Sequence, residues 1–187
     1  MGLHYLDANA LLRWAEGQAA SPSDDQAAAA ARVAEIIGDA QNTVAISELT
    51  FIEFHDQVLR YRARQTVEWT DEWMNSVQTQ LMEWIEAGTI TVQSSAPRAI
   101  DVAMTYISMA RDAGRSLKAV DALHLDRVIE WAHDTGETVS LVTGDSAFSK
   151  FIEVVPAAAR YITIEEVVVT QAPEPGTPLE DRNPNTS

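Results

Sequence analysis

Four acidic residues lie where strand-like sequence gives way to a loop or a helix: Asp7, Glu53, Asp121 and Asp145. Carboxylates that lie close together raise one another's pKa, so a cluster of them is unfavourable unless a cation neutralises it. Hard divalent cations such as Mg²⁺ or Mn²⁺ take oxygen ligands, and a water bound to such an ion can attack a phosphodiester. These residues therefore predict metal-dependent hydrolysis of an oxygen-rich substrate, and they leave open whether one ion or two take part.

The elements expected to position these acids are strands that alternate with helices. Short apolar or β-branched segments predict strands at 3–6, 43–47, 89–93, 138–143 and 161–164. Helical spacing of apolar residues predicts helices at 9–16, 27–37, 97–114 and 119–133, with 17–26 as a loop. A long helical region starts near 47–53 and runs to about 86, as one helix or two. This alternation predicts an α/β fold with a doubly wound parallel sheet and helices on both faces.

The domain organisation follows from length and composition. With 187 residues, 46% of them hydrophobic, the chain suits one domain with a substantial core. We expect that domain over 1–170, and a disordered tail over 171–187, where the sequence becomes polar and proline-rich.

Binding sites in open parallel sheets form outside the carboxyl ends of the strands, so we expect the four acids at one edge of the sheet. Each acid also has a purely structural interpretation. Asp7 could cap the helix that begins at Asn9, and Glu53 could complete a capping box with Thr50. Asp121 could favour a helix N-terminus through the dipole, and Asp145 could serve only the turn that contains it.

Several classes of protein are excluded or disfavoured by composition. The absence of cysteine excludes disulfides, thiolate zinc sites and a cysteine nucleophile, and it fits a reducing cytoplasm. No segment reaches the ~18–20 apolar residues of a membrane span. The N-terminus enters strand-like sequence at once, so we expect no signal peptide, no membrane contact and a cytoplasmic location.

The net charge of −15, from 28 acidic and 13 basic residues, should repel nucleic acid at long range. It could serve solubility, or it could attract a basic segment of a partner protein. Three cations that lead into Asp121 are candidates for phosphate binding: Arg111, Arg115 and Lys118. The alternative is that they form a solvated helix end with a favourable dipole interaction.

Four motifs resemble those of PIN-domain proteins, in particular the VapC-like toxins of bacterial and archaeal toxin–antitoxin pairs. They are Tyr5-Leu6-Asp7-Ala8-Asn9, Ile46-Ser47-Glu48-Leu49-Thr50-Phe51-Ile52-Glu53, Val120-Asp121-Ala122-Leu123-His124-Leu125 and Val142-Thr143-Gly144-Asp145-Ser146-Ala147-Phe148. Their order and approximate spacing agree with the family from about residue 3 to 164, and Asp-Ala-Leu-His is the most distinctive. The segments 17–42 and 66–96 are longer than in compact members of the family, and we expect 66–96 to be a helical insertion.

The resemblance implies a Mg²⁺- or Mn²⁺-dependent endoribonuclease that acts on RNA. It gives metal-ligand and catalytic roles to the four acids, with Asn9 and Thr143 as supporting residues. It also implies a homodimer and a cognate antitoxin whose tail enters the site. Two positions stay open. Asp126 replaces a common small residue and could be an extra ligand, a salt-bridge partner or a surface residue, and His124 could face the site or only pack.

Two other functions remain possible on the same sequence. The acidity and the tryptophan-bearing insertion also suit a non-catalytic PIN-like module that binds a protein partner. A structure-specific DNA nuclease could use the same four acids.

Overall fold

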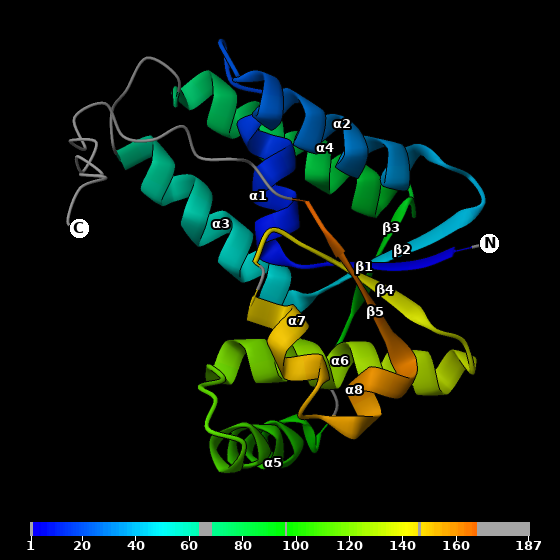
Figure 1. The fold of residues 1–187 in the computed structure, drawn as a ribbon. Coiled ribbons are helices and arrows are strands. Elements are labelled where there is room, and N and C mark those ends of the chain that lie inside the picture. The colour runs from blue at the N-terminus through cyan, green and yellow to red at the C-terminus, as the bar shows by residue number, and fades with distance from the viewer. Residues whose placement is uncertain (1, 64–68, 96, 146, 168–187) are drawn as a thin grey trace, which may run out of the picture.

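The structure, a computed structural model, describes residues 2–63, 69–95, 97–145 and 147–167 (Figure 1). The expected disordered tail at 171–187 lies outside these residues, so that expectation stays a prediction. Among the described residues, no helix is both long enough and apolar enough to cross a membrane.

The core of the fold is a five-stranded sheet in the order β3-β2-β1-β4-β5. Every pairing in it is parallel. The strands are β1 (Gly2–Leu6), β2 (Asn42–Ser47), β3 (Ile90–Gln93), β4 (Val139–Thr143) and β5 (Ile162–Glu166). β1 lies at the centre, where Tyr5 is opposite Ala45 on one side and Leu141 on the other. The predicted doubly wound parallel sheet is therefore confirmed.

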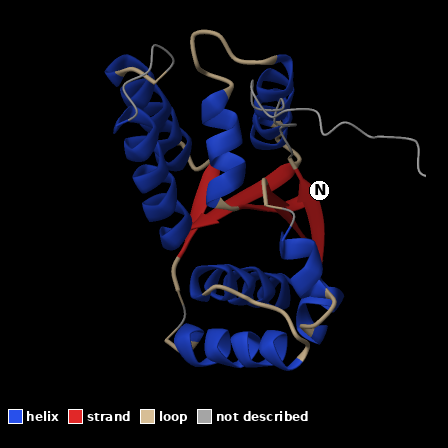
Figure 2. Ribbon diagram, turned by 60° about the vertical axis from the view of Figure 1, so that its left-hand side comes forward, coloured by secondary structure: helices blue, strands red, loops and turns tan. Residues whose placement is uncertain are grey.

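Helices cover both faces of this sheet (Figures 1 and 2). One layer contains α1 (Ala8–Glu16), α2 (Asp24–Gly38), α3 (Glu48–Ala63) and α4 (Asp71–Glu86). The other contains α5 (Ala99–Asp112), α6 (Ala119–Thr135), α7 (Ala147–Ile152) and α8 (Pro156–Tyr161). Successive side chains of a strand point to opposite faces, so Leu6 joins the core beneath α1–α4 and Tyr5 joins the core beneath α5–α8.

Local hydrogen bonds at helix ends account for the boundaries that the hydrophobic pattern missed. The expected loop 17–26 is shorter than predicted, because Ser23 and Gln26 form a capping box and α2 begins at Asp24. The region after β2 divides into α3 and α4. α3 is capped by Ser47, whose Oγ accepts from the Thr50 amide at 3.0 Å, so the alternative of a Thr50–Glu53 capping box is wrong.

α4, which lies in the segment expected to be a helical insertion, is part of the core. Trp73 of α4 is 6% exposed, and its Nε1 donates to the carbonyl of Ala15 in α1 at 2.9 Å. Val77 and Leu81, one and two turns further along α4, are buried in the same cluster. The insertion thus helps to fix α1, the helix that begins at Asp7.

Candidate functional site

Two of the four acids are placed by adjacent strands. Asp7 directly follows β1, and Asp145 follows β4 after a short turn. The strands run parallel, and the Asp7 amide extends their ladder by donating to the Val142 carbonyl at 3.1 Å. Asp7 also caps α1, because its Oδ1 accepts from the Ala10 amide at 2.7 Å. The capping interpretation of Asp7 is therefore correct, and it does not prevent the residue from lying at the sheet edge.

The other two acids come from helices on opposite faces of the sheet. Glu53 lies in the second turn of α3, and Asp121 lies in the first turn of α6. All four acids line one cavity of about 320 Å³ at this edge. The other residues that line it are Ala8, Asn9, Gln57, Lys118, Ala119, Val120, His124 and Phe148. The expectation that the acids share one edge thus agrees with the geometry.

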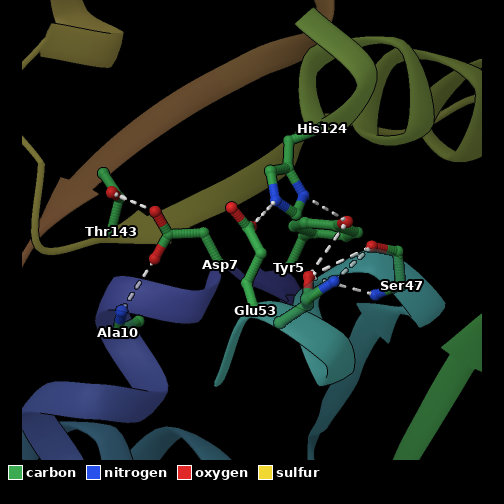
Figure 3. A network of polar contacts seen from close by, with 8 residues as sticks. Tyr5, Asp7, Ala10, Ser47, Glu53, His124 and Thr143 are labelled. Carbon is green, nitrogen blue, oxygen red and sulfur yellow. Dashed lines mark hydrogen bonds and ion pairs between the residues drawn. The ribbon is translucent and has the colours of Figure 1, made fainter. Parts of the chain in front are cut away.

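Asp7 is the most deeply buried of the four acids, with 2% of its surface exposed. Burial raises its pKa from 3.8 to about 6. Hydrogen bonds from the Thr143 hydroxyl at 2.6 Å and from the Ala10 amide oppose that rise (Figure 3). Thr143 Oγ1 also accepts from the Asp145 amide at 2.9 Å, so this buried hydroxyl joins Asp7 to the turn that carries Asp145.

The charges in the cavity act on one another. The pKa of Asp121 is raised mainly by burial, and the negative charges of Asp145 and Glu53 raise it further. Lys118 and His124 act in the opposite direction. A carboxylate whose pKa is raised by neighbouring carboxylates is the electrostatic signature expected of a site that attracts a cation.

The carboxylate of Glu53 is positioned by a hydrogen-bond network that runs through His124 and Tyr5 to Thr50 (Figure 3). Its Oε2 lies 2.7 Å from Nε2 of His124, and Nδ1 of that ring lies 3.1 Å from the Tyr5 hydroxyl. The Tyr5 hydroxyl in turn lies 3.4 Å from Oγ1 of Thr50. His124 is only 3% exposed. Both interpretations of His124 are therefore correct, since it is a packed histidine with satisfied nitrogens that also lines the cavity.

The turn before Asp145 packs closely against α1. A Cβ placed on Gly144 would lie 3.2 Å from Nε of Arg13 and 3.3 Å from Cβ of Asn9. The guanidinium of Arg13 pairs with Glu16 at 2.7 Å, and Glu16 accepts from the Tyr61 hydroxyl at 2.6 Å. The close approach of Gly144 to Arg13 of α1 is a contact that the sequence analysis missed.

The three candidate phosphate-binding cations are not equally placed. Lys118 lines the cavity, whereas Arg111 and Arg115 are absent from its described lining. Arg115 lies 3.8 Å from Glu153, which follows α7.

Gln57 lines the cavity although the sequence analysis missed it, and its spacing of four residues from Glu53 on one helix face was the available signal. Asp126 is buried in another part of the molecule, so it is neither a ligand in this cavity nor a surface residue.

The donor set of the cavity suits a hard divalent cation, since it consists of carboxylate and amide oxygens. The raised pKa values of Asp7 and Asp121 show that negative charge is destabilised there, and a cation would relieve that cost. Across the described residues, however, no three side chains of the types His, Cys, Asp and Glu are gathered closely enough to hold an ion. Mg²⁺ commonly binds through one or two carboxylates and keeps several waters, so a set of separate carboxylates still fits it.

Comparison with known proteins gives matches in structure only. No protein-family model matches the sequence, and no curated protein matches it. A chain of VapBC2 from Rickettsia felis, solved with a promoter DNA fragment, matches with a TM-score of 0.55 and 14% identity, over 88% of this chain and 98% of that chain. VapBC-1 from nontypeable Haemophilus influenzae matches with a TM-score of 0.53 and 12% identity, over 88% and 98%. FitAcB from Neisseria gonorrhoeae matches with a TM-score of 0.52 and 17% identity, over 88% and 97%.

These matches cover nearly the whole of the known chains. They show that this protein has the PIN-like fold of the VapC-type chains in such assemblies, and the resemblance seen in the sequence motifs is confirmed at the level of fold.

Proposed function

We propose that this protein is a Mg²⁺- or Mn²⁺-dependent endoribonuclease that hydrolyses phosphodiester bonds of RNA. The observation that carries the proposal is the cavity at the sheet edge, where acids from four separate segments line one space of about 320 Å³. The low identity of the structural matches means that the chemistry rests on these residues and not on the fold.

The four acids would hold the metal, one or two of them directly and the others through its bound waters: Asp7, Glu53, Asp121 and Asp145. A bound divalent ion would supply a water of lowered pKa and stabilise negative charge on the phosphate. The chain's other residues position these groups. Thr143 fixes the Asp7 carboxylate, and His124 fixes that of Glu53. Lys118 lines the cavity and would attract the phosphate locally, against a net charge of −15.

Cleavage assays can test this proposal. RNA and DNA of the same sequence would be incubated with wild-type protein in Mg²⁺, in Mn²⁺ and in EDTA, beside Asp145→Asn and the control Asp134→Asn, whose carboxylate is exposed on α6. We expect metal-dependent RNA cleavage that is lost in Asp145→Asn and kept in the control. Undiminished cleavage by Asp145→Asn would refute its role. Cleavage of DNA in place of RNA would favour the structure-specific DNA nuclease.

A second candidate function is a non-catalytic module that binds a partner protein. The specific observations in its favour are that Glu53 is engaged by His124 and that the described side chains form no group of three around an ion. Calorimetric titration with Mn²⁺ separates the two candidates. Absence of Mn²⁺ binding, together with a stable complex with a protein partner, would support the module and exclude the metal-dependent enzyme.

We further propose that the protein is the toxin of a toxin–antitoxin pair, acting in the cytoplasm as a homodimer and blocked by a cognate antitoxin. VapBC and FitAcB, which have similar folds, support this proposal, and the acidic charge suits a basic inhibitory segment. Expression of the wild-type chain should arrest growth, whereas Asp145→Asn should not. Co-expression of a small protein encoded next to it should relieve the arrest.

A further inference from the structure

A second cavity, of about 380 Å³, lies among α5, α6 and α8 in the helix layer that contains α5–α8. Its apolar lining includes Val102, Ile129 and Ala157 and the rings of Tyr106 and Tyr161. One water takes up about 30 Å³ in the liquid, so this space is large enough for a small organic group. The residues of this cavity are distinct from those of the acidic site, and nothing in the proposed nuclease function uses them.

Asp126 is the buried charged residue of this cavity, with 7% of its surface exposed. Within the described chain, its carboxylate makes no hydrogen bond. Burial raises its pKa, and the charge of Arg127 only partly opposes that rise. The two terminal nitrogens of Arg127 are bound to the carboxylate of Glu130 and to the carbonyl of Ser94, and its Nε is buried without a hydrogen-bond partner in the described residues. The carboxylate oxygens of Asp126 are not among the fully enclosed polar atoms that lack a partner in the described residues, so they are accessible from the cavity. A cationic group that enters the cavity could therefore take the place of water at this carboxylate.

The other charged residues that line the cavity lie at its rim or are paired with another side chain. Arg98 and His133 are exposed at its rim, and His133 lies 4.0 Å from Asp134. Glu130 is paired with Arg127. The cavity therefore combines one deep carboxylate with apolar and aromatic walls.

We propose that this cavity binds an alkylammonium or alkylguanidinium group, with the cation donating to Asp126 and its alkyl stem lying against Val102 and Ile129. A charge-assisted hydrogen bond to a carboxylate is stronger than one between neutral groups. Tyrosine rings also attract cations, and the guanidinium carbon of Arg160 already lies 5.2 Å from the ring centre of Tyr161. Such a group could belong to a free amine or to a lysine or arginine side chain of another protein.

The binding test uses the full chain labelled with ¹⁵N and titrated with n-butylammonium, with n-butanol as the neutral probe of equal length. We expect saturable shifts of amides in α5, α6 and α8 with the cation and much weaker ones with the alcohol. Asp126→Asn should weaken binding of the cation at least about tenfold, because it removes the charge and keeps the shape. Asp112→Asn makes the same change at the exposed end of α5, outside the lining of the cavity, and should leave binding unchanged.

A second variant guards against an effect of Asp126→Asn on folding. Ala157→Phe fills the cavity without altering a charge, and it should also block binding while melting curves report whether the variant is folded. Equal affinity of n-butylammonium for wild type and Asp126→Asn, or no saturable shift in wild type, would overturn the proposal. A blocked Gly-Lys-Gly peptide separates the sources. Tighter binding of the peptide than of n-butylammonium indicates a protein side chain, and weaker binding indicates a free amine.

Discussion

Replacing Asp7 by asparagine is expected to stabilise the fold while it abolishes the proposed cleavage. Asp7 is 2% exposed, and burial raises its pKa to about 6, so its charged form is destabilised in the folded protein. Asparagine has the same shape, and its amide oxygen can still accept from the Ala10 amide. Its NH₂ group can donate to the hydroxyl oxygen of Thr143. The variant thus removes the buried charge with little change in packing.

The magnitude follows from the pKa. A rise from 3.8 to about 6 corresponds to about 3 kcal/mol of lost stability when the carboxylate is charged. Because the folded pKa of Asp7 lies above the unfolded one, this loss is absent below pH 3.8, grows between 3.8 and about 6, and is complete above that. The variant gives up part of the strong Thr143 hydrogen bond, so we expect a net gain of about 1–2 kcal/mol at pH 8.

Urea unfolding followed by circular dichroism can measure this gain at pH 8 and at pH 4, in EDTA, with Asp134→Asn as the control. The gain should be present at pH 8 and absent or reversed at pH 4, where most of the charge cost is gone and the weakened Thr143 hydrogen bond remains. Mn²⁺ should then stabilise wild type more than Asp7→Asn, because only wild type has the Asp7 carboxylate whose negative charge the ion would neutralise. If Asp7→Asn is less stable than wild type at pH 8, or if its advantage is the same at both pH values, the reasoning from carboxylate burial is refuted.

Three further substitutions address the contacts that hold the site. Thr143→Val should lower the free energy of unfolding by about 1–3 kcal/mol. It should also raise the pKa of Asp7, because the Thr143 hydroxyl lowers that pKa by its hydrogen bond, and NMR titration of the Asp7 side chain measures this rise. His124→Gln should release Glu53 and reduce kcat of RNA cleavage with little change in KM, and a change confined to KM would contradict this role. Gly144→Ala should lower the melting temperature and slow cleavage, because its Cβ would crowd the Arg13 side chain; unchanged melting and activity would show that the turn adapts freely.

Much of the sheet edge could be predicted from the sequence because its physical causes are local. The segments before Asp7 and Asp145 are apolar runs that read as buried strands, and parallel strands in one sheet end at the same edge. That reasoning needs only the order of elements along the chain. It also places Glu53 and Asp121 at the same edge, as the structure does, because both lie in the first two turns of a helix that follows a strand or a loop.

The lining residues that the sequence left open or missed depend on how helices rotate and pack: His124 was left open, and Gln57 was missed. Gln57 and His124 line the cavity because they lie one turn beyond Glu53 and Asp121 on the same helix faces. Asp126, only two residues after His124, points into a different cavity. Composition gives no sign of that difference, since the orientation of α6 is set by its packing against α5 and β4.

The geometry of the acidic cavity has two separable origins. The relation between Asp7 and Asp145 is set by the β1–β4 register and by the Thr143 hydroxyl that contacts both, so it is part of the sheet itself. Glu53 and His124 instead bring together α3 from one helix layer and α6 from the other, at the point where the two layers meet beyond the sheet edge. A change in either helix core that shifts α3 against α6 should therefore alter the position of Glu53 and leave the Asp7–Thr143 contact intact. The proposed metal affinity and catalytic rate can in this way respond differently to mutations far from the cavity, because Asp7 and Asp145 follow the sheet whereas Glu53 follows the packing of the helices.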